Sequence, residues 1–223
     1  MIRETATLQE FQLFNKELYE LVDDRNYSSL DLLSYLLRHV TKLLKAVRKQ
    51  KHDTVSYHLC MALSWTLATA NRMHIEVSSE MWIRFPNLCP YCSSRPCSCR
   101  ERTSERKKVD ELSEATPPTT LFEWQRMFHE IYPNNTVQDS VVHLVEEVGE
   151  LNEAIRNYLS THREGSFEKI TEELVDVFAN LFALAHCLGL DLGKESVGYF
   201  RNGCPKCQRF PCGCEYVLID EPI

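Results

Sequence analysis

Four carboxylates in the C-terminal half are spaced so that they can share one cation. Glu147 and Glu150 are three residues apart, and Glu173 and Asp176 repeat that spacing. Residues at i and i+3 share a helix face, so two antiparallel helices bring all four groups together. Four like charges repel strongly unless a hard cation joins them, and oxygen-only ligands favour Mg²⁺ or Mn²⁺ over zinc. We therefore predict a magnesium or manganese site at these residues.

The alternative for these acidic residues is an ordinary solvated helix face, which is the commoner fate of a charge run. The apolar neighbours argue against it, because Asp176 lies between Val175 and Val177 in a nearly all-apolar segment. An unpartnered carboxylate would be costly to bury there. Asn180 lies one turn beyond Asp176, and we expect it to contact a phosphate oxygen or a metal-bound water.

Eight of the ten cysteines form two clusters with the pattern Cys-Pro-x-Cys followed by Cys-x-Cys. Because the N-terminus lacks the apolar segment of a secretion signal, this spacing predicts metal binding rather than disulfides. Each set of four thiolates suits one structural zinc ion, two per chain, with an iron–sulfur cluster as the minor alternative. The spacing leaves open whether ligands are exchanged between the sets, which are Cys89, Cys92, Cys97, Cys99 and Cys204, Cys207, Cys212, Cys214. Cys60 and Cys187 are expected to be plain core residues.

The chain also repeats itself. Each clustered cysteine recurs 115 positions later, residues 55–77 align with 170–192 at the same displacement, and residues 39–47 align with 147–155 at a displacement of 108. This predicts two copies of one helical unit, residues 1–99 and 119–223, joined by a charged linker at 100–118. Apolar periodicity predicts an all-α fold, with three longer helices and one short helix per copy. The helices are expected near 7–22, 29–50, 54–74 and 79–84, and near 119–132, 137–160, 167–188 and 194–201.

The first copy has lost the acidic residues. The same alignment places His39, Lys42, His58 and Met61 opposite Glu147, Glu150, Glu173 and Asp176, respectively. One metal site per chain is therefore expected, with the first copy acting as a scaffold. A sharper alternative is that Arg38 joins His39, Lys42 and His58 in an anion site.

The acidic segments carry a resemblance to a known family. HLVEEVGELNEAI followed by EELVDVFANLFALA resembles the Glu-x-x-Glu and Glu-x-x-Asp signature of the MazG-like and dimeric dUTPase group of all-α nucleotide pyrophosphohydrolases. The resemblance implies an Mg²⁺-dependent hydrolase that cleaves a (d)NTP to a (d)NMP and pyrophosphate, with Glu147, Glu150, Glu173 and Asp176 as catalytic metal ligands. One of them, Glu147 or Glu150, would orient or deprotonate the attacking water. Asn180, Lys194 and Arg201 are candidate substrate-binding residues.

The resemblance also implies a quaternary arrangement. The family usually works as a dimer with a shared four-helix core, so two tandem MazG-like repeats are expected to pack as a pseudo-dimeric helix bundle, each followed by a small Cys₄ zinc knuckle. Further association into a homo-oligomer is left open. Trp124, Phe128 and Phe178 could stack a base, but aromatic residues at helical spacing are more often core.

Charge and hydropathy restrict the partners. The formal net charge is −7, and neither half has the basic stripe of a dedicated nucleic-acid-binding protein. No apolar run approaches the roughly 18 residues that span a bilayer. These observations predict a cytoplasmic protein with no membrane partner and no nucleic-acid partner, whereas a nucleotide substrate is what the family resemblance implies. The alternative function is a non-catalytic adaptor that holds a partner protein or nucleic acid through its zinc tails or the basic face of the first copy.

Overall fold

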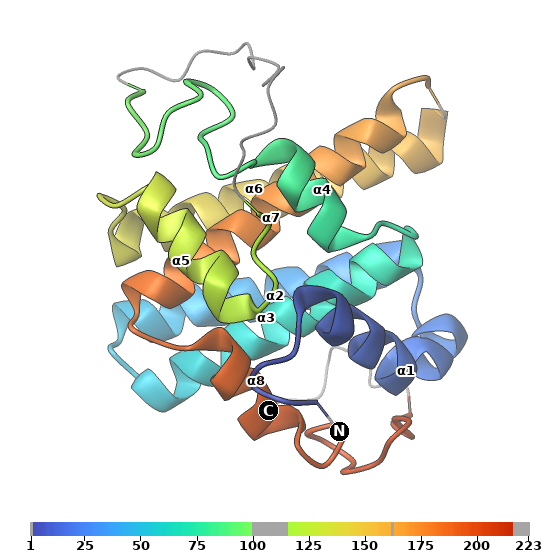
Figure 1. Cartoon of the computed structure of the whole chain (residues 1–223). Helices are drawn as coiled ribbons and strands as arrows, with labels where there is room; N and C mark the ends of the chain where they lie inside the picture. The colour runs from blue at the N-terminus through green and yellow to red at the C-terminus, as the bar shows by residue number, and fades with distance from the viewer. Residues whose placement is uncertain (1, 100–115, 162, 216–223) are drawn as a thin grey trace.

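In the described residues, 2–99, 116–161 and 163–215, the computed structural model is all-helical, as predicted. The helices of the first half are α1 (Leu8–Asn26), α2 (Ser29–Arg48), α3 (His52–Arg72) and α4 (Val77–Arg84). Those of the second half are α5 (Leu121–Ile131), α6 (Val137–Thr161), α7 (Ser166–Cys187) and α8 (Leu192–Phe200). All eight lie within a few residues of the expected ranges (Figure 1). Most of the predicted linker lies outside the described residues.

Side-chain caps fix where most of the long helices begin. Thr7, Ser28 and Thr120 each accept a hydrogen bond from the backbone three residues on, and an acidic side chain there bonds back to the cap. Thr136 accepts from the Asp139 backbone in the same way before α6. These bonds satisfy backbone donors that the first helical turn leaves without partners. The chain bends sharply after α7 at Gly189, whose φ of +67° suits glycine.

Four helices form the centre of the molecule. α2 packs on α3, α6 packs on α7, and the two pairs meet where α2 contacts α6 and α3 contacts α7. The stripe Leu36, Val40 and Leu43 on α2 is fully buried. So is the matching stripe Leu144, Val148 and Leu151 on α6. Each half thus supplies one helix pair to a shared four-helix core.

The two halves also exchange their C-terminal segments. α4 packs against α7 of the other half, while α8 packs against α3. Beyond these helices, the Cys97 N–H donates to the carbonyl of Ile131 at 2.7 Å, and the Cys212 N–H donates to the carbonyl of Leu18 at 2.7 Å. The two cysteine-bearing loops lie on opposite sides of the molecule, one near α5 and the other near α1 (Figure 1). Each loop is therefore docked on the first helix of the opposite half.

Corresponding polar side chains make the same bonds in both halves. Gln12 donates to the carbonyl of Ile75 and accepts from the Val77 N–H at 2.7 and 3.0 Å. Gln125 makes the equivalent pair of bonds to the carbonyl of Leu190 and the Leu192 N–H, both at 2.8 Å. Each glutamine thus connects the first helix of its half to the turn that precedes the short last helix of that half. We interpret the halves as two copies of one unit.

No single helix among the described residues is long and apolar enough to cross a membrane. α7 and α8 reach the necessary length and composition only together, and they are bent by 98° relative to each other.

Candidate active site and cysteine clusters

Carboxylates of α6 and α7 converge at one point. Glu147 on α6 and Glu173 and Asp176 on α7 each place one carboxylate oxygen within 4.8 Å of the other two. Glu150, one turn further along α6, is exposed and lies beside Glu173 at the edge of this group. The i and i+3 spacing of both pairs produces this convergence because α6 and α7 pack along each other. Three of the four predicted ligands thus surround one point, with the fourth adjacent.

The environment of this carboxylate cluster disfavours its own charge. Glu173 is only 1% exposed, and both of its carboxylate oxygens are buried without a hydrogen bond from the described residues. The compensating contact is an ion pair with Lys169, one turn earlier on α7. Burial, followed by repulsion from neighbouring carboxylates, raises the pKa of Glu147 to about 8. Burial and Glu173 also raise the pKa of Glu150.

A divalent cation fits this site. Buried oxygen atoms without hydrogen bonds and mutually repelling carboxylates are what such an ion would satisfy, and the donors are all oxygens.

A guanidinium from the other half completes the cluster. Arg84, the last residue of α4, donates from Nε to Asp176 Oδ1 at 2.5 Å and from Nη2 to Asp176 Oδ2. The two side chains are only 8% and 13% exposed. Sequence reasoning missed this residue, since only the packing of α4 on α7 brings it to the site. Its position is the sequence signal. Arg84 ends the short helix of the first half, and the candidate Arg201 directly follows the short helix of the second half.

A cavity of about 800 Å³ opens beside the carboxylates. The four acidic residues and Asn180 line one side, while the docked loop of the first half contributes Cys89, Tyr91, Cys97 and Cys99 to another. Lys194 and Arg201 are not among the lining residues. Both are exposed, at the beginning of α8 and just after it, and α8 packs on α3 and α5. Of the two short helices, α4 and not α8 brings a cationic side chain to the carboxylates.

The equivalent space in the first half is filled with rings. Tyr35 stacks on Trp65 at 4.7 Å between centroids, and Tyr27 meets both rings edge-on at 5.2 and 5.7 Å. By the displacements of the two halves, Tyr27, Tyr35 and Trp65 correspond to Asn135, His143 and Asn180, all of which line the cavity. In the first half, packed aromatic rings therefore occupy the positions whose counterparts line the cavity in the second half.

The ligand positions of the first half hold a histidine pair. His39 and His58 place their Nδ1 atoms 3.2 Å apart, and Tyr199 stands at the position corresponding to Arg84. Burial, His58 and nearby cations lower the pKa of His39 to about 3, and burial with Lys42 and Arg38 lowers that of His58 to about 4. Both imidazoles are neutral near pH 7, which argues against an anion site built from four cations.

The remaining aromatic candidates and Cys60 are core residues, whereas Cys187 is not. Trp124, Phe128 and Phe178 are fully buried, so they do not face the cavity. Cys60 is also fully buried, while Cys187 is half-buried and donates to the carbonyl of Asn135.

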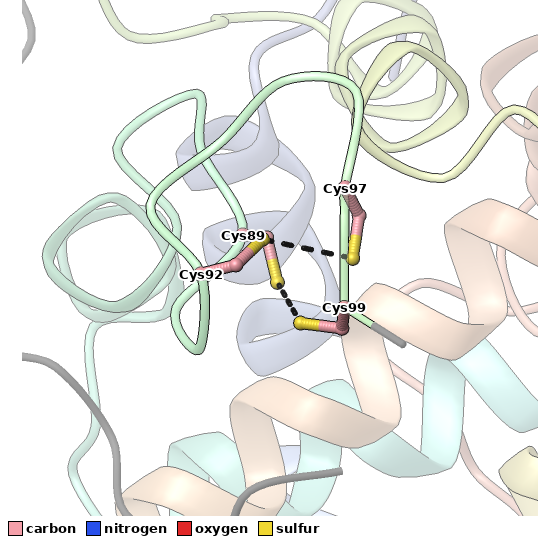
Figure 2. A group of neighbouring side chains, drawn as sticks. All are labelled: Cys89, Cys92, Cys97 and Cys99. Atoms are coloured by element: carbon pink, nitrogen blue, oxygen red, sulfur yellow. Dashed lines mark hydrogen bonds between the residues drawn. The ribbon is translucent and has the colours of Figure 1, made fainter. Parts of the chain in front are cut away.

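Each cysteine cluster gathers within its own half, so the ligand sets are not exchanged. Figure 2 shows the side chains of Cys89, Cys92, Cys97 and Cys99 converging, with sulfur separations of 3.9 Å for Cys89–Cys99 and for Cys92–Cys97. The corresponding pairs of the second cluster are 3.8 Å apart. Tetrahedral zinc with Zn–S bonds of about 2.3 Å requires sulfur atoms about 3.8 Å apart. Both clusters therefore have the dimensions of a single-ion Cys₄ site.

The thiols differ within each loop. Burial and neighbouring cysteines raise the pKa of Cys97, Cys99, Cys212 and Cys214, whereas one thiol in each loop has a lowered pKa. Although burial acts in the opposite direction, hydrogen bonds from Ser94 and Ser98 lower the pKa of Cys92 to about 5. Backbone N–H groups of Gly213 and Arg209 likewise lower the pKa of Cys207 to about 7 against the effect of burial. Thiolates are the form of cysteine that binds a metal ion.

Part of the chain matches a known protein family. Residues 135–197, which comprise α6, α7 and most of α8, match the MazG nucleotide pyrophosphohydrolase domain. Comparison with curated proteins gave no match, and comparison with solved structures gave none. The matched segment contains all four residues of the carboxylate cluster and Asn180.

Proposed function

From the premise that residues 135–197 form a MazG nucleotide pyrophosphohydrolase domain, we propose that the chain cleaves a nucleoside triphosphate to the monophosphate and pyrophosphate. The observation that carries the proposal is the cluster of Glu147, Glu173 and Asp176 at the edge of an 800 Å³ cavity. A cavity of this size is within the range that holds a small-molecule ligand. An adaptor without activity would need neither the inward-facing carboxylates nor the cavity.

The positions of the carboxylates suit them to different roles in the proposed reaction. Glu147, Glu173 and Asp176 would hold Mg²⁺, which when bound neutralises phosphate charge and polarises the phosphorus under attack. Glu150 is exposed and adjacent to this group, so it is placed to orient the attacking water and accept its proton. Lys169, on the cavity wall, can exchange its pairing with Glu173 for a phosphate oxygen.

The first half indicates where a base would bind. In that half an indole stacks on a tyrosine ring, whereas the second half has Asn180 and His143 at the same positions and an open cavity. We assign this space to the nucleobase, stacked on His143 as Trp65 stacks on Tyr35. The amides of Asn135 and Asn180 can donate and accept hydrogen bonds at the base edge. Asn180→Trp should close the space and raise KM for every nucleotide.

The cysteine clusters are proposed to bind one zinc ion each in a structural role. Four thiolates leave no open coordination position for chemistry. The sulfur separations of 3.8–3.9 Å support a single ion in each loop. Metal analysis of protein purified without chelators should find two zinc ions per chain. Visible absorbance of an iron–sulfur cluster, or protein without zinc, would overturn this assignment.

The proposed activity is tested by incubating the purified chain with each common (d)NTP in Mg²⁺ or Mn²⁺. The products are identified as the monophosphate and pyrophosphate by chromatography, with Asp176→Asn as the negative control. Nucleotide-dependent release of pyrophosphate that requires metal and Asp176 supports the proposal. Absence of hydrolysis with every nucleotide, while the protein is folded and binds metal, would favour the adaptor.

A further inference from the structure

The contact between Arg84 and Asp176 joins the two halves at the proposed metal site. Arg84 belongs to α4 of the half that has no carboxylate cluster, and its guanidinium contacts both oxygens of Asp176. Both side chains are nearly buried. A bidentate guanidinium–carboxylate pair fixes the plane and rotation of the carboxylate, which a single lysine contact would not do.

The position of Arg84 is behind the ligand rather than in the substrate space. Asp176 lines the cavity and Arg84 does not. Each carboxylate oxygen has two lone pairs, so an oxygen that accepts from Arg84 can still face a cation on its other side. Ligand carboxylates at metal sites are commonly held by such hydrogen bonds, and their orientation affects metal affinity.

The first half provides an internal comparison. At the position corresponding to Asp176 the first half has Met61, and at the position corresponding to Arg84 the second half has Tyr199 on α8. Tyr199 packs on Tyr57 with ring centroids 5.5 Å apart, as an aromatic contact suited to joining α8 to α3. The fold therefore does not require a guanidinium at the end of the short helix. Arginine is found at that end in the half whose short helix faces the carboxylates.

From these contacts we propose that Arg84 is a positioning residue for Asp176, supplied by the half that lacks the carboxylates. It orients the Asp176 carboxylate toward Glu147 and Glu173, so that the three oxygens meet at one cation. The inference rests on the proposed metal site but not on hydrolysis. Its consequence is that the first half completes the metal site chemically as well as packing against the second.

The test measures Mn²⁺ affinity of the full-length, zinc-loaded chain by calorimetry, without nucleotide. Arg84→Ala should weaken Mn²⁺ binding by about 10- to 100-fold. Arg84→Lys keeps the charge but not the bidentate geometry, and should weaken it less. In an Asp176→Asn background, Arg84→Ala should cause no further loss, because the pair acts as a unit.

A matched control is available in the same segment of the chain. Arg95, in the cysteine loop of the first half, forms an ion pair with Glu130 on α5 and so also joins the two halves. Arg95→Ala should leave Mn²⁺ affinity within about twofold of the parent, since Arg95 touches no carboxylate of the cluster. Thermal unfolding of all variants separates loss of fold from loss of affinity, and Arg84→Lys decides the matter if the alanine variant does not fold.

The outcomes are distinct. Unchanged Mn²⁺ affinity in Arg84→Ala with reduced thermal stability would make Arg84 a purely structural link and overturn the proposal. Tighter Mn²⁺ binding would overturn it as well, because Arg84 would then compete with the cation for Asp176. If Mn²⁺ binding depends on Arg84 but no nucleotide is hydrolysed, the inference stands and the proposed function fails.

Discussion

Glu173 is held in an environment that opposes its charge. It is 1% exposed, the ion pair with Lys169 is its compensating contact, and the carboxylates of Glu147 and Asp176 are its neighbours. A buried carboxylate in this situation lowers the stability of the metal-free protein. In the proposed metal site, the same features would make it a strong ligand for a divalent cation. Stability and metal binding therefore place opposite demands on this residue.

Replacing Glu173 with glutamine should separate these demands. The neutral amide removes repulsion and can donate to Glu147 or Asp176, so the metal-free protein should gain about 1 kcal/mol, or roughly 2–4 °C in Tm. Metal-dependent hydrolysis should fall at least about 100-fold. Calorimetry of chelator-treated protein and a pyrophosphate assay measure the two effects.

The matched control is Glu168→Gln, an exposed acidic residue in the first turn of α7. This substitution should leave both the Tm of the metal-free protein and the rate of hydrolysis close to those of the parent. A Glu173→Gln protein that is less stable than the parent, or that remains active, would contradict the assigned role of this residue.

The His39–His58 pair should make stability depend on pH. Because the folded-state pKa values of about 3 and 4 lie below the ordinary value of 6.5, the unfolded chain binds more protons at mildly acidic pH. The contribution of the pair is complete above pH 6.5 and is lost as pH falls toward these values. At pH 5 the loss is about 2 kcal/mol per histidine.

Urea unfolding at pH 5 and pH 7 measures this loss. The double variant His39→Gln, His58→Gln should show a smaller difference in unfolding free energy between the two pH values. His52→Gln, at an exposed histidine in the first turn of α3, should behave like the parent. Equal pH dependence in all three proteins would show that the pair is not responsible.

At the scale of elements, the two cysteine loops have equivalent places in the fold but different neighbours. The first loop lines the cavity through Cys89, Tyr91, Cys97 and Cys99. The second docks on α1, and the first half has an aromatic cluster in place of a cavity. Zinc in the first loop should therefore affect catalysis, whereas zinc in the second should affect stability alone.

The corresponding cysteines Cys92 and Cys207 allow a direct comparison. Each Cys→Ser variant should retain one zinc ion instead of two, measured by elemental analysis. Cys92→Ser should lower kcat/KM by about tenfold or more, because it loosens a wall of the cavity. Cys207→Ser should lower Tm but leave kcat/KM within about twofold at a temperature where it is folded. Equal losses of kcat/KM would contradict the asymmetry.

Most helix boundaries could be predicted from the sequence because they depend on local interactions. All eight helices lie within a few residues of the expected ranges, and features such as the Thr136 cap and the positive φ of Gly189 depend only on neighbouring residues. The convergence of Glu147, Glu173 and Asp176 followed from spacing on two helices that pack together.

What could not be predicted depends on contacts between distant segments. The i and i+3 rule says nothing about which short helix covers α7, so Lys194 and Arg201 were considered while Arg84 was overlooked. The ring cluster of Tyr27, Tyr35 and Trp65 was also missed, because its rings come from separate segments. In the sequence, each of these aromatic residues alone indicates only a core position.

At the scale of the whole molecule, the halves depend on each other for both packing and chemistry. α6 and α7 bury apolar faces against α2 and α3, and Phe85 and the cysteine loop of the first half line part of the cavity. A fragment containing residues 119–223 should therefore associate with itself or unfold, and should show no more than a few per cent of the parent hydrolysis. A fragment containing residues 1–118 should have none.

Mixing the two fragments should restore activity, because the surfaces that each lacks are supplied by the other. Sedimentation and the pyrophosphate assay, on separate and mixed fragments, measure this. A monomeric, fully active fragment of residues 119–223 would show that the first half is an independent domain, although it would leave the assignment of the carboxylates intact.

The reciprocal docking of the two cysteine loops has a consequence for how such a protein can diverge. In a symmetric homodimer every substitution appears in both subunits, so a ring that fills one pocket also fills the other. Joining the subunits in one polypeptide removes that constraint. Here Trp65 closes one pocket while Asn180 leaves the other open, and Arg84 can serve a carboxylate that its own half no longer has. The linked chain permits specialisation that identical subunits cannot reach.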